Sequence, residues 1–269
     1  MSAEARTSSP HDATVSAVGG AMGWSIMSRV LQVLLSFIGS IVVVRWLGPD
    51  RFGLLTVLRT SLAFVAALCG LGLGQAVLRY FPTARAHGDR SLAVRLVRWT
   101  VLPQIGAWAA AVLLIWIFGP LISRVAFPEV SQLFLLGTVI VLAELAFLAA
   151  TNLTTAFYDS RGLSMVTLGG AISYLVFVSL TLWLKFDVAG ALVATGLSHL
   201  LMAVILARRL SRQIASIPEK GDGSSGALLS AGTVFRYSLP FGAIAVMNLI
   251  IYLPGARGKP HRAPRHQKL

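Results

Sequence analysis

Long apolar runs separated by short polar connections make up most of the chain. A run of about 20 apolar residues is long enough to cross a bilayer as an α-helix. The pattern predicts six such helices and the start of a seventh, at residues 24–44, 54–77, 97–118, 132–150, 163–184, 188–207 and 236–253. We therefore predict an all-α fold, a polytopic transmembrane helix bundle of six to seven spans.

The polar segments divide the chain further. Residues 1–23 are small and polar and predict a cytoplasmic leader before the six-helix bundle of residues 24–207. Residues 208–235 are basic and rich in Gly and Ser, which favours a flexible cytoplasmic linker. The tail, residues 254–269, changes abruptly to an Arg, Pro and His composition. This change indicates a frameshift or a premature end within the seventh span. A genuine basic tail behind a shorter segment that does not cross is the alternative.

Composition supports the membrane class. Hydrophobic residues make up 56% of the chain, charged residues 12%, and the mean hydropathy is +0.76. Soluble domains carry about 25% charged residues. The net charge of +13 does not form a basic face, because the arginines lie in short loops between apolar runs, so we expect no nucleic-acid partner.

The loops also predict an orientation. Loops after the even-numbered spans carry Arg79, Arg85, Arg90, Arg95, Arg98, Arg161, Arg208, Arg209, Arg212, Lys220 and Arg236. Loops after the odd-numbered spans carry only Arg45, Arg51, Arg124 and Lys185. Because basic residues are retained on the cytoplasmic side, we expect a multi-pass protein whose N-terminus and even-span loops are cytoplasmic.

Two motifs follow the first predicted span. The string LGPDRFG runs from Leu47 to Gly53, and GLGQAVLR runs from Gly72 to Arg79. The LGP-x-x-FG and GLG-x-x-x-x-R combination resembles the polysaccharide-biosynthesis family of membrane proteins. These are lipid-linked oligosaccharide flippases of the O-antigen type, within the multidrug/oligosaccharidyl-lipid/polysaccharide exporter superfamily.

The resemblance implies a function and a setting. It implies alternating-access flipping of lipid-linked oligosaccharide or polysaccharide precursors across a bacterial inner membrane, from the cytoplasmic to the outer face. The implied partners are a polyprenyl-diphosphate-linked glycan, membrane lipids, and glycosyltransferases or polymerases of the same pathway. Family members have about twice as many helices, in two related bundles. The resemblance therefore covers the N-terminal bundle, and we expect a truncated fragment of such a transporter.

Ionisable side chains inside a span are the candidate functional residues, because each costs roughly 2.5–3.5 kcal/mol on insertion scales. Arg29 and Gln32 lie on one face of the first span, and Arg59 lies near the start of the second. We predict that these residues bind the cargo, since guanidinium pairs well with phosphate. The alternative is that the arginines extend to lipid headgroups.

Glu144 and His199 lie in the middle of the fourth and sixth spans. They are candidates for ion coupling or for an ion pair with an arginine. A hydrogen-bonded histidine between helices is the plainer interpretation of His199. Gly70 and Gly74 have the small-xxx-small spacing that permits close helix packing.

Catalytic motifs are missing from the sequence. It contains no Walker P-loop, no G-x-S-x-G elbow and no HExxH, and its acids are few and scattered. We therefore predict no enzyme activity, no catalytic residues, no metal and no cofactor. The rivals to a flippase are a small-molecule or drug exporter of the same superfamily, a membrane-embedded enzyme, and a non-transporting fragment or a half-molecule that acts as a dimer.

Overall fold

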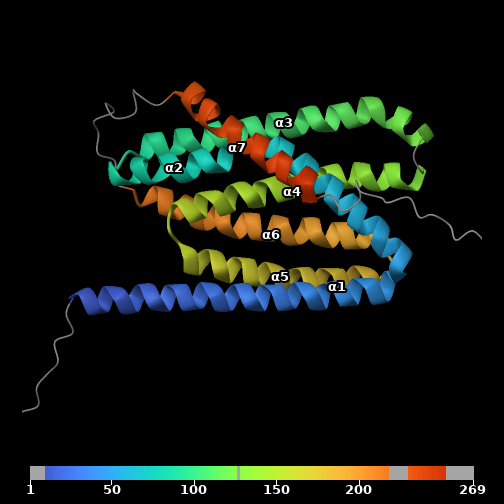
Figure 1. Ribbon diagram of the computed structural model, residues 1–269, viewed down its shortest axis with the longest axis horizontal. Helices are drawn as coiled ribbons and strands as arrows, with labels where there is room; N and C mark the ends of the chain where they lie inside the picture. The colour runs from blue at the N-terminus through green and yellow to red at the C-terminus, as the bar shows by residue number, and fades with distance from the viewer. Residues whose placement is uncertain (1–9, 126–127, 218–229, 253–269) are drawn as a thin grey trace, which may run out of the picture.

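Figure 1 shows a bundle of long helices in the computed structural model, which describes residues 10–125, 128–217 and 230–252. The helices are α1 (Pro10–Gly70), α2 (Leu73–Ala86), α3 (Arg90–Val125), α4 (Pro128–Ala156), α5 (Ser160–Trp183), α6 (Asp187–Ala215) and α7 (Ala231–Tyr252). This confirms the all-α prediction. By length and composition α1, α3, α4, α5 and α6 can each cross a membrane, which makes five such helices in the described residues.

Helix α1 contains the first predicted span and residues 54–70 of the second. It breaks at Gly48, whose φ of 76° and ψ of 168° suit glycine alone, and Pro49 follows the break. We call residues 10–47 the first arm and residues 49–70 the second arm. The connection expected between the first two spans, residues 45–53, therefore has only one non-helical residue. In Figure 1 the first arm lies beside α5, and the second arm turns back across the bundle.

The second predicted span, residues 54–77, is not one helix. Helix α1 ends at Gly70, and α2 begins at Leu73. Gly72 between them has a φ of 65°, and a Cβ atom there would meet the backbone of Ser238 and Gly242 on α7. The chain turns at this point because glycine allows both the positive φ and the close approach of α7.

The basic segment expected to be a loop is mostly helical. Helix α2 continues to Ala86 and α3 starts at Arg90, so only residues 87–89 are non-helical. Asp89 starts α3, since its Oδ1 accepts a 2.8 Å hydrogen bond from the backbone N–H of Leu92. Asp159 starts α5 in the same way, with a 2.9 Å bond from the N–H of Gly162.

The helices also extend into other segments expected to be polar connections. Helix α1 begins at Pro10, so residues 10–23 of the expected leader are helical. Helix α6 continues to Ala215 and α7 begins at Ala231, within the expected linker of residues 208–235. The tail at residues 254–269, the start of the leader at residues 1–9 and the centre of the linker at residues 218–229 lie outside the described residues.

Three apolar clusters form the core of the described chain, and α4 and α6 contribute to all of them. The first cluster joins the second arm of α1 to α4, α5 and α6 through buried residues such as Leu58, Val141 and Leu192. The second joins α2 and α3 to α4, α6 and α7 around Phe81, whose ring lies 4.8 Å from that of Phe157. Helices α4 and α6 are therefore the centre of the bundle.

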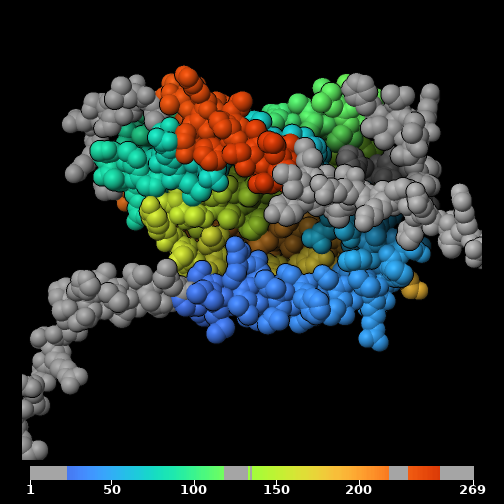
Figure 2. All heavy atoms as spheres, in the orientation of Figure 1, coloured from blue at the N-terminus to red at the C-terminus, as the bar shows by residue number. Residues whose placement is uncertain are grey.

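The outer surface is apolar along the helices. Exposed large side chains include Phe37, Ile41, Trp116, Val176 and Met247. Figure 2 shows the first arm of α1 lying along one edge of the molecule. A soluble protein does not leave so much apolar surface in water, so these helices suit a hydrocarbon environment.

Candidate functional site

A cavity of about 310 Å³ lies between the second arm of α1, α4 and α6, and three of the sequence candidates line it. They are Arg59, Glu144 and His199, and they come from three different helices. The other lining residues are Thr60, Leu62, Ala63, Ile140, Leu192 and Thr195. The fold thus brings together Arg59 and His199, which are 140 residues apart in the sequence.

Arg59 supplies the positive charge of this cavity. Its side chain is exposed, and its guanidinium carbon lies 5.7 Å from the centroid of the Tyr174 ring on α5. This is a cation–π distance, so Tyr174 helps to orient the guanidinium group. In the described part of the chain no salt bridge joins Arg59 to Glu144; the two salt bridges there are Arg51 to Asp187 and Arg209 to Asp159.

His199 is held by an aromatic ring. Its imidazole stacks on Phe147, with the ring centroids 5.2 Å apart and the planes 5° apart. Its Nδ1 atom is buried and has no hydrogen-bond partner among the described residues. Glu144 precedes Phe147 by three positions on α4, so both face the same side of that helix. The cavity therefore places a carboxyl group and an imidazole beside an arginine.

The ionisable groups of this cavity can bind an anion and exchange protons. An exposed guanidinium binds phosphate or carboxylate, and the carboxyl and imidazole groups can take up or release a proton. No three His, Cys, Asp or Glu side chains gather into a metal-binding cluster in the described residues. Glu144 and His199 alone are fewer ligands than a protein zinc site uses.

Arg29 and Gln32 lie elsewhere. Both are on the first arm of α1, which packs mainly beside α5, and neither lines this cavity. Arg29 is exposed and Gln32 is half-buried. The structure therefore groups Arg59 with Glu144 and His199, and separates it from the two residues with which the sequence prediction had placed it.

Gly70 and Gly74 do not form one packing surface. Gly70 ends α1 and Gly74 lies in α2, on the other side of the break at Gly72. A Cβ atom on Gly74 would meet the Asn152 side chain of α4, whereas one on Gly70 would meet nothing within 4 Å. Gly74 is a close-packing residue and Gly70 is not.

Several residues around the cavity were missed by sequence reasoning. Tyr174 and Phe147 lie in predicted apolar spans and were not among the candidates, although each contacts an ionisable member of the cavity. Thr195 carries a usable signal, because it precedes His199 by four positions and so shares its face of α6. No comparable local signal marks Tyr174, whose role depends on how α5 packs.

The motif residues behind the family resemblance lie at two turns of the chain. Gly48 of LGP breaks α1, and Gly72 of GLG separates α1 from α2, both with positive φ. Comparisons of the chain with protein-family models, with curated proteins and with solved structures give no match.

Proposed function

We propose that this chain forms one helix bundle of a bacterial inner-membrane exporter that flips lipid-linked oligosaccharides. The observation that carries the proposal is the cavity in which Arg59, Glu144 and His199 meet between apolar helices. An arginine inside a membrane span is costly, so it normally faces a cavity or a partner. The diphosphate of a polyprenyl-linked glycan is such a partner, since it is anionic and accepts paired hydrogen bonds from guanidinium.

The proposed topology has six spans, with the two arms of α1 crossing separately and α7 contributing a seventh apolar segment. The start of α3, the end of α4, the start of α5 and the end of α6 share one end of the bundle in Figure 1. These helix ends carry Arg90, Arg95, Arg98, Arg161, Arg208, Arg209 and Arg212. We place this end and the N-terminus in the cytoplasm by the positive-inside rule. Transport would follow alternating access, in which this bundle moves against a second one around the cavity.

A small-molecule or drug exporter of the same superfamily is the second candidate. The observation that favours it is the aromatic lining near the acid: Phe147 and Tyr174 both contact ionisable members of the cavity. Aromatic faces and a carboxylate suit an organic cation. The sign of the cargo's charge therefore separates the two candidates.

Reconstitution in vesicles tests the proposal. The purified chain would be incorporated at several protein densities, because a second bundle can be a second copy. The cargo would be a fluorescent polyprenyl-diphosphate oligosaccharide in the outer leaflet. We expect translocation by the wild-type chain. Arg59→Gln should lower the translocation rate at least about tenfold, because it removes a charged hydrogen-bond partner. Lys185→Gln should leave the rate near normal.

Lys185 is a matched control because it is an exposed basic residue outside the cavity. Absence of glycan translocation at every protein density would contradict the flippase. Uptake of organic cations that requires Glu144 and tolerates Arg59→Gln would support the drug exporter instead.

A further inference from the structure

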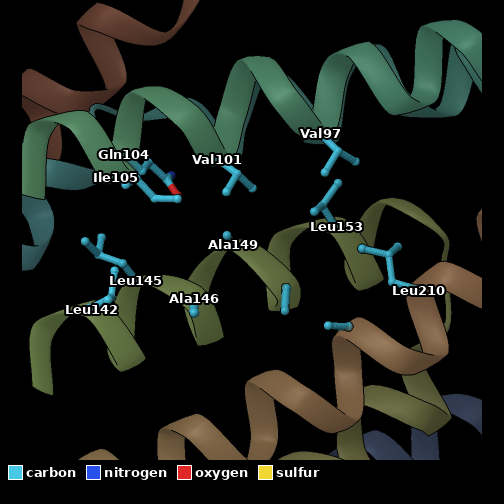
Figure 3. A pocket seen from close by; sticks show the side chains of 12 residues that line it. Val97, Val101, Gln104, Ile105, Leu142, Leu145, Ala146, Ala149, Leu153 and Leu210 are labelled. Carbon is cyan, nitrogen blue, oxygen red and sulfur yellow. The ribbon is translucent and has the colours of Figure 1, made fainter.

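A second cavity, of about 230 Å³, lies between α3, α4 and α6 and carries no charge (Figure 3). The side chains that line it are apolar except for Gln104 on α3. The Nε2 atom of Gln104 donates a 3.4 Å hydrogen bond to the carbonyl of Gly70. Of these two cavities, the one at Arg59 is therefore the one that offers a positive charge to an anion. How the Arg59 side chain is held bears directly on that binding.

The guanidinium group of Arg59 lies against the ring of Tyr174 on α5. The guanidinium carbon is 5.7 Å from the ring centroid, and no salt bridge involves Arg59 in the described part of the chain. An exposed arginine has many rotamers, so it loses conformational freedom when it binds a ligand. A cation–π contact that already restricts those rotamers makes this loss smaller.

The same tyrosine ring packs against the first arm of α1 at Gly39. A Cβ atom on Gly39 would lie 3.3 Å from Cε1 of Tyr174 and 3.2 Å from Cδ2 of Leu175. Carbon atoms in optimal contact are about 3.5–4.0 Å apart, so the ring takes up space that a side chain at residue 39 would need. Tyr174 is half-buried and also packs on the first apolar cluster. The first arm and this cluster together hold the ring in place.

Tyr174 thus contacts both arms of α1. Gly39 lies on the first arm and Arg59 on the second, on opposite sides of the break at Gly48. A Cβ atom on Gly23, which is also on the first arm, would meet nothing within 4 Å. The close fit is therefore a property of the position of Gly39 and not of the whole arm.

We propose that Tyr174 is a positioning residue for anion binding at Arg59, and that Gly39 sets the position of its ring. This inference deepens the proposed function and rests on it, because the anion is the diphosphate of the proposed cargo. The ring holds the guanidinium in one orientation at the cavity. Its loss weakens anion binding before and during transport alike, which raises the half-saturating cargo concentration and leaves the maximal rate unchanged.

Cargo titration in the reconstituted vesicles tests this role. Tyr174→Leu removes the ring and should raise the half-saturating concentration of the polyprenyl-diphosphate oligosaccharide roughly two- to fivefold. Tyr174→Phe keeps the ring and should restore the wild-type value. In the Arg59→Gln background Tyr174→Leu should have no further effect, because a positioning residue acts only through the group that it positions. An unchanged half-saturating concentration in Tyr174→Leu, or a further loss in the Arg59→Gln background, would overturn the proposal.

Gly39 supplies an independent variant. Gly39→Val places a branched side chain against the ring and should raise the half-saturating concentration in the same direction as Tyr174→Leu. Gly23→Val is the matched control, because it makes the same change on the same arm where a Cβ atom meets nothing within 4 Å. If Tyr174→Leu fails to fold, the comparison of the two valine variants decides the result. Equal values for both would contradict the role of Gly39.

Chemical modification of arginine separates this inference from the transport proposal. Phenylglyoxal reacts with guanidinium groups, and peptide mass spectrometry of the full chain in detergent gives the rate at each arginine. We expect the rate at Arg59 to rise severalfold in Tyr174→Leu and in Gly39→Val, because the ring no longer covers the guanidinium. Arg161, an exposed residue of α5, is the internal reference and should react equally in all proteins.

The two readouts distinguish the possible failures. A faster reaction at Arg59 in both variants, without glycan translocation by the wild-type chain, would support the positioning by Tyr174 and remove the flippase. Wild-type reaction rates at Arg59 in both variants would overturn the positioning role, even in vesicles that translocate the glycan.

Discussion

The imidazole of His199 on α6 lies flat against the ring of Phe147 on α4, with centroids 5.2 Å apart and planes 5° apart. This contact joins the two central helices at the edge of the cavity that contains Arg59. Because the Nδ1 of His199 has no hydrogen-bond partner among the described residues, the aromatic stack fixes the orientation of the ring.

Phe147→Ala should therefore release His199. We expect the rate of modification of His199 by diethyl pyrocarbonate to rise severalfold, because the ring gains access to the cavity when its cover is removed. Peptide mass spectrometry reports the rate for each histidine. His87 is exposed in the short connection between α2 and α3 and is the internal reference, expected to react equally in both proteins. Equal rates at His199 would show that the stack does not shield it.

Asp89 predicts a pH dependence of stability. The N–H of Leu92 and then the hydroxyl of Ser91 donate hydrogen bonds to its carboxylate, which holds the pKa of Asp89 below its ordinary value. A lowered folded-state pKa gives stabilisation that is present above the unfolded value of about 3.9 and is lost as pH falls through the folded one. Asp89→Asn keeps a capping side chain that does not titrate in this range.

The thermal stability of the wild-type chain in detergent should thus fall relative to that of Asp89→Asn as the pH is lowered from about 5 to 3. At pH 7 the wild-type chain should keep whatever extra stability over Asp89→Asn the charge of the Asp89 carboxylate supplies. Parallel melting profiles of the two proteins across this range would remove Asp89 as a source of the pH dependence.

Asp159 ties the start of α5 to the end of α6. Its Oδ1 accepts from the Gly162 N–H, and its Oδ2 accepts a 3.1 Å hydrogen bond from Gln213 and lies 3.5 Å from Arg209. Asp159→Ala should lower the free energy of unfolding by roughly 1–2 kcal/mol, the sum of a lost cap and a weak, partly exposed ion pair. Asp159→Asn should cost less, because the cap remains.

A double-mutant cycle of Asp159→Ala with Arg209→Ala measures how much the Asp159–Arg209 ion pair contributes to the free energy of unfolding. We expect a coupling energy of about 0.2–1 kcal/mol, as for other exposed pairs. Denaturant titration in a fixed detergent supplies the free energies. A cost for Asp159→Asn as large as that for Asp159→Ala would show that the charge, and not the cap, is what α5 needs.

Two glycine substitutions should have opposite effects. Gly72→Ala forces a side chain into a positive-φ position and into the backbone of α7, so it should lower the melting temperature and displace α7. Gly169→Ala lies inside α5, where a Cβ atom would meet nothing within 4 Å. It should stabilise the helix by about 0.5–1 kcal/mol. Equal melting temperatures for both variants would contradict the close crossing at Gly72.

The all-α class was predictable because apolar length alone decides whether a segment can span a membrane. The division into helices was not, since α1 holds the first predicted span and part of the second, and five of the described helices are long and apolar enough to cross. The positions of the breaks were less predictable. A connection at residues 45–53 was expected, but the sequence could not show that it needs only one non-helical residue, Gly48. The turn at Gly72 was not expected, because that residue lies inside the predicted span of residues 54–77. The basic segment at residues 79–95 was expected to be a loop because it is polar, yet it is amphipathic, and burial of Phe81 and Leu96 makes it helical.

The members of the candidate site were partly predictable. Charge inside an apolar run singled out Arg59, Glu144 and His199, but spacing along the chain could not show that they share a cavity. Arg29 had the same sequence signal as Arg59 and lies on another arm of α1. The difference arises from the break at Gly48, which turns the second arm into the bundle and leaves the first at its edge.

The break at Gly48 also bears on exposure to proteases. Proteases bind extended backbone and cut preferentially at exposed loop tips. At this end of the bundle the chain reverses at a single glycine, Gly48. Arg51, three residues further on, pairs with Asp187, which follows the three-residue turn between α5 and α6. Neither connection contains a stretch of extended backbone long enough to bind in the active-site cleft of a protease. An enzyme that reaches the protein from this side would find helix ends rather than cleavable loops at both of these turns.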